Sequence, residues 1–318
     1  MQLAAWPTPL ELKHHPHLGA LLVKRDDLSN FGGNRSSGVK ARKLEGLLAY
    51  LHDRGKTSLE IALGNITNLG ADLDEVARAA KIRLRLQILD DPPLPLHLRQ
   101  DLFRNMDAEV TLHGPSWAAA ALRTLKRRLG SIGTAHYVTL PSPAHPAAVL
   151  GATAGYLEAM EQARTECGVI PRAVYIASAA GSTAAGFVLG ETLMRRAGAP
   201  PVDIVAVPVV NQPVGLTTTI LARWTAHRYA MGQPDFNLKI AKDPRNLRYG
   251  RFDQALEQVC QRVEQDHELR IDPIYGGKSW RTMEEREVGR PDRRPVLFWH
   301  CGYTACWQAC REELCYDG

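Results

Sequence analysis

Residues 173–190 read AVYIASAAGSTAAGFVLG, an apolar run that passes into small residues and then into a helical pattern. The segment Ala173–Ala177 predicts a buried strand, and Ser182–Ala197 predicts the helix that follows it. Small residues let the backbone approach a ligand closely, and a helix start offers unpaired N–H groups and positive dipole density. This unit therefore suits a bound phosphate, the alternative being a tight turn capped by Ser182. It lacks a Walker lysine and the G-x-G-x-x-G spacing, which disfavours a nucleoside triphosphate or a dinucleotide.

Short apolar runs alternate with helical stretches along the rest of the chain. The strands that these runs predict are residues 20–24, 59–63, 83–88, 109–112, 173–177, 203–208 and 296–299. The helices predicted around them are residues 39–53, 69–80, 96–106, 117–128, 146–168, 182–197, 217–231, 251–265 and 279–287. Strands separated by helices of this length imply βαβ crossovers, so we predict an open α/β fold with mostly parallel sheets. Residues 238–249 are expected to form a long irregular loop.

The bulk composition is that of an ordinary globular protein and argues against several functions. The 318 residues are 45% hydrophobic and 23% charged, with a formal net charge of +5. The basic residues are scattered, and their densest run, Arg123–Arg128, predicts one exposed helix face, which disfavours nucleic-acid binding. No apolar run approaches the length of a membrane span, and the N-terminus lacks a secretory pattern. We therefore expect no membrane association and a cytoplasmic location.

Four of the six cysteines lie near the C-terminus, at positions 301, 306, 310 and 315. Their spacing is not C-x-x-C, and no pair of close-set ligands faces another, so we predict no metal site. The favoured interpretation is reduced thiols on the last helix and the loop before it. Cys306 and Cys310 would share one helical face.

A second candidate for chemistry is the run Lys40-Ala41-Arg42-Lys43-Leu44-Glu45 at the start of a predicted helix. Lys40 and Lys43 lie one turn apart and face the same way. Positive charge at this end opposes the helix dipole. A protein tolerates it when an anion is bound nearby or when one lysine is neutralised as an imine. The alternative is two solvated lysines.

A third candidate is Asp272-Pro273-Ile274-Tyr275-Gly276-Gly277-Lys278, ahead of the apolar run that ends at Trp299. Tyr275 sits at a turn bounded by proline and glycine. There its ring is able to lie over a planar ligand, the alternative being a packed turn tyrosine.

Taken together and in this order, these stretches resemble the 1-aminocyclopropane-1-carboxylate (ACC) deaminase and D-cysteine desulfhydrase family. That family consists of fold-type-II, tryptophan synthase beta-like enzymes that use pyridoxal phosphate (PLP). The resemblance begins at Pro7-Thr8-Pro9-Leu10 and continues in patches to Val296–Gly302. It implies PLP as cofactor and a lyase or deaminase acting on a small amino acid, by elimination, replacement or epimerisation at Cα or Cβ.

The resemblance also implies roles for single residues. Lys40 would hold the cofactor as an imine and, once released, act as base or acid at the substrate Cα. Tyr275 would stack beside the ring and help to move protons, and Thr67 would stand near the substrate carboxylate. The other cofactor contacts would come from Lys43 near the phosphate, Asn68 at the ring hydroxyl, and Gly181, Ser182 and Thr183 with the backbone of Ala179 and Ala180 around the phosphate.

Three departures from the family pattern suggest a different substrate. An insertion at residues 35–39 separates Gly32-Gly33-Asn34 from Lys40, and the segment 64–70 is one residue shorter. Gly276 stands where the family places Glu or a small hydroxyl residue near the pyridine nitrogen. Cys301 replaces a residue that helps to set specificity, and its thiol is one candidate to face that nitrogen. We expect a specialised relative, the alternative being a catalytically silent relative that binds a ligand or a partner.

For the architecture we expect two open α/β domains. The small domain would span residues 44–148 and would be inserted into a large PLP-binding domain made of residues 1–43 and 149–318. The cofactor would lie in the cleft between them, near the carboxyl ends of strands. The resemblance further implies a homodimer.

Overall fold

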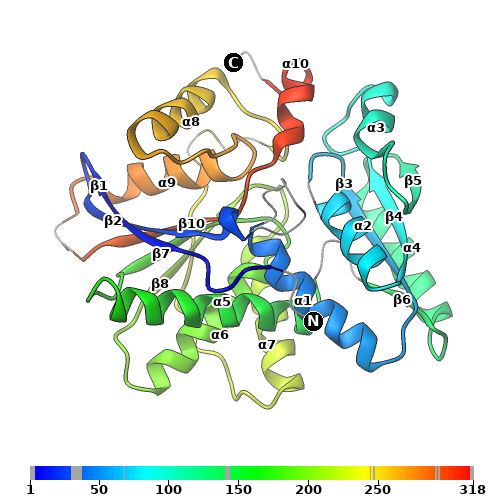
Figure 1. Ribbon diagram of the computed structural model, residues 1–318, viewed down its shortest axis with the longest axis horizontal. Helices are drawn as coiled ribbons and strands as arrows, with labels where there is room; N and C mark the ends of the chain where they lie inside the picture. Colours follow the sequence, from blue (N-terminus) through cyan, green and yellow to red (C-terminus); the bar gives the residue numbers. More distant parts are fainter. Residues whose placement is uncertain are drawn as a thin grey trace.

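The structure is a computed structural model, and it describes residues 4–29, 38–67, 69–139, 144–243, 245, 248–290, 292 and 294–315. It contains two separate sheets (Figure 1). The larger sheet has the strand order β1-β2-β10-β7-β8-β9. Its strands are β1 (Leu10–His15), β2 (Gly19–Arg25), β7 (Ala173–Ser178), β8 (Asp203–Pro208), β9 (Leu238–Ile240) and β10 (Val296–His300). The pair β1–β2 is antiparallel, and the other pairs in this sheet are parallel.

The smaller sheet is wholly parallel, with the order β5-β4-β3-β6. Its strands are β3 (Ser58–Gly64), β4 (Arg83–Leu89), β5 (Glu109–His113) and β6 (His136–Val138). All four come from one continuous stretch of chain between the two halves of the larger sheet.

Helices follow the strands in the alternation that the sequence predicts. They are α1 (Val39–Asp53), α2 (Leu69–Ala79), α3 (Leu96–Phe103), α4 (Trp117–Gly130), α5 (Pro146–Thr165), α6 (Ser182–Arg196), α7 (Val214–Arg228), α8 (Gln254–His267), α9 (Gly276–Glu287) and α10 (Arg311–Leu314). Two 3₁₀ helices, η1 (Asp26–Leu28) and η2 (Ala305–Cys310), complete the described elements. Within the part of the chain that is described, no helix has the length and apolar character needed to cross a bilayer.

The larger sheet is buried on both faces, as expected for strands joined by helical crossovers. Leu22 and Val174 belong to a core shared with helices α5, α6 and α7. Leu21 and Tyr175, one position along each strand, belong to a second core shared with α8 and α9. Figure 1 shows the two groups of helices on opposite sides of the sheet.

Helix α1 joins the two halves of the molecule. Its residues Leu44, Leu47 and Leu51 pack in one core with α2 and strands β3 and β4. Its other side lies against α5 so closely that a Cβ on Gly46 would stand 2.1 Å from the Ala147 carbonyl oxygen. The element that carries Lys40 and Lys43 is therefore held from both sides.

The expected fold class is confirmed, and the position of α1 is predicted to the residue. Strands β1, β6 and β9 were not predicted. The prediction of an irregular loop over residues 238–249 is wrong at its start, because residues 238–240 pair with β8. The domain limits at residues 44 and 148 stay a prediction.

The prediction for the C-terminal cysteines also needs correction. Cys306 and Cys310 lie in the 3₁₀ helix η2, where residues three apart, not four, share a face. They therefore do not form the α-helical i, i+4 pair that was expected.

Candidate active site

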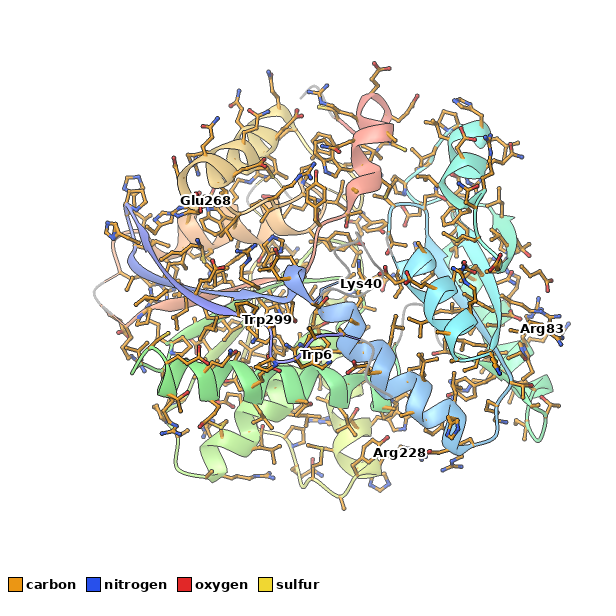
Figure 2. All side chains as sticks on the ribbon, in the orientation of Figure 1. Trp6, Lys40, Arg83, Arg228, Glu268 and Trp299 are labelled. Atoms are coloured by element: carbon orange, nitrogen blue, oxygen red, sulfur yellow. The ribbon has the colours of Figure 1, made fainter. Side chains whose placement is uncertain are left out.

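Three stretches that are far apart in sequence meet at the start of α1. The Lys40 ammonium nitrogen lies 5.4 Å from the centroid of the Tyr275 ring. The Lys43 ammonium donates to the hydroxyl of Ser182, the first residue of α6, at 3.4 Å. Figure 2 shows Lys40 at the middle of the molecule, between the two sheets.

The first turn of α1 is anchored to the end of β10. The Val39 amide donates to the Cys301 carbonyl at 3.1 Å. Gly38, which precedes the helix, has φ +55°, and a Cβ there would stand only 1.7 Å from that same carbonyl oxygen. Only glycine fits both the conformation and the contact. This contact fixes where the helix begins, and with it the place of Lys40.

Lys43 provides a physical test of whether the site fits a phosphate. Its side chain is buried, and no carboxylate among the described residues pairs with it. Burial, and then the positive charge of Lys40, lower the pKa of the Lys43 ammonium from 10.5 to about 8. Of the groups that the structure describes, its ammonium bonds the Ser182 hydroxyl at a helix start, and a buried ammonium in such a place is suited to an anion.

The turn between β7 and α6 has the shape such an anion needs. The N-terminal cap is Gly181, with φ +80°, and not Ser182 as the capped-turn alternative required. A Cβ on Gly181 would lie 2.7 Å from the Thr218 hydroxyl, so the turn is tightly packed. The buried hydroxyl of Ser178, at the end of β7, has no hydrogen-bond partner in the described part of the chain. Together with Lys43, these residues fit the phosphate group of a cofactor.

Tyr275 is positioned by a buried carboxylate. Asp272 is fully buried and accepts hydrogen bonds from the amides of Ile274, Tyr275 and Thr304, at 2.9, 2.7 and 3.1 Å. The Tyr275 hydroxyl lies 3.0 Å from that of Tyr249, and burial raises the pKa of both phenols. Both hydroxyls are therefore protonated at neutral pH.

A small cavity of about 70 Å³ adjoins these tyrosines. It is lined by Leu63, Gly64, Thr67, Leu69, Trp117, Ala179, Ala180, Val210, Gln212, Tyr249 and Tyr275. Thr67 also borders a wider cavity of about 850 Å³ that includes Tyr303 and Cys306. The small cavity is thus bounded by loops at the carboxyl ends of β3 and β7, one strand from each sheet.

A protein-family model described as "Pyridoxal-phosphate dependent enzyme" matches residues 1–302. The chain belongs to this family. Two curated relatives, both named ACC deaminase, align with this chain over nearly their whole length. The protein from Burkholderia vietnamiensis is 29% identical, with 98% of this chain and 96% of the relative covered. The protein from Variovorax paradoxus is 26% identical, with 93% and 91% covered. The resemblance seen in the sequence is confirmed, and PLP is the cofactor of the family.

Solved structures show the same fold. An ACC deaminase homologue has a TM-score of 0.80 at 20% identity, with 98% of this chain and 94% of that chain covered. A hydrogen sulfide-producing enzyme from Fusobacterium nucleatum has a TM-score of 0.62 at 12% identity, with 96% of both chains covered. A PLP-dependent aspartate racemase has a TM-score of 0.64 at 14% identity, with 93% of this chain and 89% of that chain covered.

For this PLP-dependent enzyme, the structure gathers most of the residues that the sequence predicts for the cofactor. Lys40, Lys43, Ser182 and Tyr275 meet as described above, and Thr67, Ala179 and Ala180 line the small cavity beside them. Thr183 follows Ser182 in the first turn of α6 and is buried. Asn68 and residues 30–37, which include Gly32-Gly33-Asn34, lie outside the described residues.

The structure shows the surroundings of Gly276 and Cys301, two residues that differ from the family pattern. Gly276 is the first residue of α9, and a Cβ there would stand 3.0 Å from the Ile271 Cβ. It is not among the residues that line either cavity, so its missing side chain leaves no extra space there. The Cys301 thiol lies 3.5 Å from the Trp299 carbonyl oxygen, and burial raises its pKa to about 12. The thiol is therefore protonated at neutral pH.

Three positioning roles were missed from sequence. Tyr249 donates to the Ile66 carbonyl at 2.6 Å and so joins the loop after β3 to Tyr275. The segment before Tyr249 is held by Lys278, whose ammonium donates to the Arg248 carbonyl at 2.9 Å. Asp272 belongs to a quoted motif, but only its three amide contacts reveal its role. No local pattern distinguishes Tyr249 from a loop tyrosine.

Proposed function

We propose that the protein is a PLP-dependent lyase or deaminase that acts on a small amino acid at Cα or Cβ, with Lys40 as the residue that binds the cofactor covalently. One observation carries the proposal. Lys40 lies against Tyr275, while Lys43, one turn further, lies against Ser182 at the start of α6. One helical turn separates the two lysines, so Lys40 would meet the reactive end of the cofactor and Lys43 its phosphate.

The names of the relatives support the class of substrate. The curated relatives are ACC deaminases, and solved structures of similar fold include an aspartate racemase and an O-ureido-L-serine synthase. All of these names refer to amino-acid chemistry, although the reactions differ. Elimination, replacement, deamination and epimerisation are therefore the reactions to test.

When bound, the cofactor would supply an electron sink for the substrate Cα. The chain's own residues bind, orient and move protons. Lys43, Ser182, Thr183 and the turn before them would hold the phosphate. The Lys40 amine would take or give the proton at Cα.

The remaining residues would act on the substrate. The Tyr275 phenol, protonated because burial raises its pKa, would lie beside it, while Tyr249, whose proton is donated to the Ile66 carbonyl, would hold Tyr275 in place. Thr67, on the wall of the small cavity, would face the substrate carboxylate.

Borohydride reduction of the purified protein loaded with PLP tests the assignment of Lys40. Mass spectrometry of the digested wild type should find the cofactor mass on the peptide that contains Lys40. Lys40→Ala should lose it, while Lys126→Ala, a change at an exposed lysine on α4, should retain it. Cofactor trapped equally well in Lys40→Ala would overturn the assignment.

A panel of D- and L-amino acids, followed for ammonia, sulfide, 2-oxo acid and inversion of configuration, then identifies the reaction. Turnover of at least one amino acid by wild type, lost in Lys40→Ala, is the expected result. Trapped cofactor without turnover of any amino acid would instead favour the silent relative that binds a ligand or a partner.

The family resemblance also leads us to propose a homodimer and a cytoplasmic location. Sedimentation analysis of the purified protein and fractionation of the source cells test these two proposals.

A further inference from the structure

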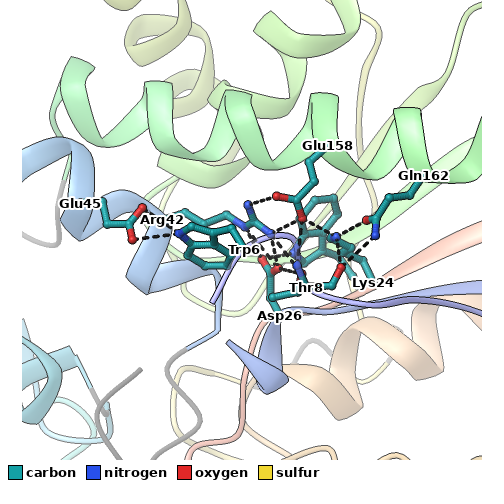
Figure 3. Close-up of polar contacts among 9 residues, drawn as sticks. Trp6, Thr8, Lys24, Asp26, Arg42, Glu45, Glu158 and Gln162 are labelled. Carbon is teal, nitrogen blue, oxygen red and sulfur yellow. Dashed lines mark hydrogen bonds and ion pairs between the residues drawn. The ribbon is translucent and has the colours of Figure 1, made fainter. Parts of the chain in front are cut away.

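A buried group of polar side chains lies between α1, α5 and the larger sheet (Figure 3). We call it the Arg42 assembly, and it comprises Thr8, Lys24, Asp26, Arg42, Glu158 and Gln162. Asp26 and Lys24 are fully buried, and the side chain of Arg42 is 5% exposed. The two cations and two carboxylates balance in formal charge.

Arg42 is held by two carboxylates at once. Its Nη2 donates to Asp26 at 2.9 Å and to Glu158 at 2.8 Å, while Nη1 donates to Glu158 at 2.9 Å and Nε to Asp26 at 3.1 Å. The planar guanidinium is suited to such bidentate contacts, and a lysine is not. These contacts fix the direction of the Arg42 side chain.

Helix α5 is shaped to receive Arg42. A Cβ on Gly151 would lie 2.0 Å from the Arg42 carbonyl oxygen, and a Cβ on Gly155 would lie 2.7 Å from its Cδ. The backbone and the side chain of Arg42 therefore pass directly over two glycines of α5. Any rotation of α1 about its axis would break this fit.

Asp26 extends the assembly to the strand that ends beside the active site. It accepts hydrogen bonds from the Thr8 hydroxyl and from the Trp299 indole, both at 2.8 Å. Trp299 lies on β10, two residues before Cys301, whose carbonyl receives the first amide of α1. The assembly and the start of α1 are thus attached to the same strand.

The position of Arg42 within α1 gives this geometry a functional meaning. Arg42 stands two residues after Lys40 and directly before Lys43. Buried ion pairs contribute little net stability, because desolvation offsets their attraction. Their location next to two functional lysines calls for a different explanation.

We propose that Arg42, held by Asp26 and Glu158, is a positioning residue that sets the orientation of Lys40 and Lys43 toward the cofactor and keeps the buried charge next to them balanced. This inference rests on the proposed function. Its electrostatic part is supported by Cys301, whose thiol pKa is raised by burial and by Asp26 and lowered by both lysines. Asp26 and the lysines therefore act on the same small region.

Loss of the guanidinium has two separate consequences. Without its fork, α1 keeps its backbone contacts with α5 and β10 but loses the side-chain contacts that orient its first turn, which weakens cofactor binding. Without its charge, Asp26 and Glu158 share only Lys24, so one buried negative charge remains uncompensated. That charge favours the protonated form of a neighbouring lysine nitrogen. The absorbance midpoint, which is the pH at which the visible absorbance of bound cofactor is halfway through its change, should therefore rise.

The experiment compares Arg42→Met, Arg42→Lys and wild type, all loaded with PLP. For Arg42→Met we expect a PLP dissociation constant raised by about tenfold or more and an absorbance midpoint moved to higher pH. Arg42→Lys retains the charge but not the fork, so its midpoint should return toward the wild-type value while its affinity stays weakened.

Arg172→Met is the matched control. Arg172 pairs with the buried Glu287, and it lies before β7, at the end of the sheet opposite to the phosphate-binding turn. This variant should lose stability but keep the wild-type affinity and midpoint. An Arg42→Met protein that shows the same behaviour as this control would overturn the inference alone. Failure of wild type to bind PLP at Lys40 would overturn the proposed function, and the inference with it.

Discussion

At the scale of single residues, the buried Lys43 gives a pH dependence with a defined sign. Its pKa is lowered from 10.5 to about 8, by burial first and then by Lys40. The unfolded chain keeps this proton up to pH 10.5, whereas the folded chain releases it near pH 8. The unfolded state therefore binds more protons between these pH values, and stability rises with pH there. Below pH 8 the buried charge lowers the free energy of unfolding by its full amount, and this loss disappears as the pH approaches 10.5.

Lys43→Met should therefore stabilise the cofactor-free protein at pH 7 by on the order of 2 kcal/mol. The difference between the variant and wild type should shrink toward zero as the pH approaches 10.5. Urea unfolding in phosphate-free buffers across this range measures it. Comparison at each pH removes the contributions of titrating groups that do not interact with Lys43. A difference that stays constant with pH would contradict the prediction.

Where chemistry concentrates in a motif, the sequence singles out residues that the fold brings close together. Lys40, Lys43, Ser182 and Tyr275 were each ambiguous alone, and their order along the chain decided the interpretation. Tyr249 escaped because its partners, Ile66 and Tyr275, are distant in sequence and only the folded chain brings them together. A hydroxyl contact of this kind leaves no local periodicity to detect.

At the scale of elements, α1 depends on the glycine that precedes it. Gly38 and Gly55 flank this helix and have similar φ angles, +55° and +61°. A Cβ at Gly38 would collide with the Cys301 carbonyl, whereas a Cβ at Gly55 would meet nothing within 4 Å. The two positions therefore separate backbone strain from steric collision.

Gly55→Ala should cost about 1 kcal/mol of unfolding free energy, through its left-handed backbone alone, and leave PLP affinity unchanged. Gly38→Ala should cost more, because the first turn of α1 has to leave β10, and should weaken PLP binding at least about tenfold. Urea unfolding and PLP titration measure the two effects. Equal behaviour of both variants would show that the contact with Cys301 does not position the helix.

The elements that the sequence predicted are those with strong periodicity or burial, such as α1 and β7. The missed strands β6 and β9 have three residues each and lie at sheet edges. Such short runs carry too few side chains for a pattern, and their pairing depends on a neighbouring strand already in place. Strand β1 was missed because its alternation, Leu10-Glu11-Leu12-Lys13, is that of a half-exposed edge strand and lacks a continuous apolar run.

At the scale of the whole molecule, the candidate site lies between two sheets whose strands pack in different cores. Leu63 and Gly64 end β3 of the smaller sheet, and Ala179 and Ala180 follow β7 of the larger one, yet all four line one cavity. Helix α1 packs against both halves and carries the two lysines. A ligand bound there contacts both sheets, so it should stabilise them together.

Added PLP should therefore raise the melting temperature of wild type by about 4 °C at one hundred times its dissociation constant. Amide hydrogen exchange should slow in peptides from both β3 and β7. Inorganic phosphate should give a smaller shift that Lys43→Met abolishes, since it occupies only the anion-binding part of the site. Protection confined to β7 and α6, with β3 unchanged, would place the cofactor on the larger sheet alone and exclude a cleft shared between the two.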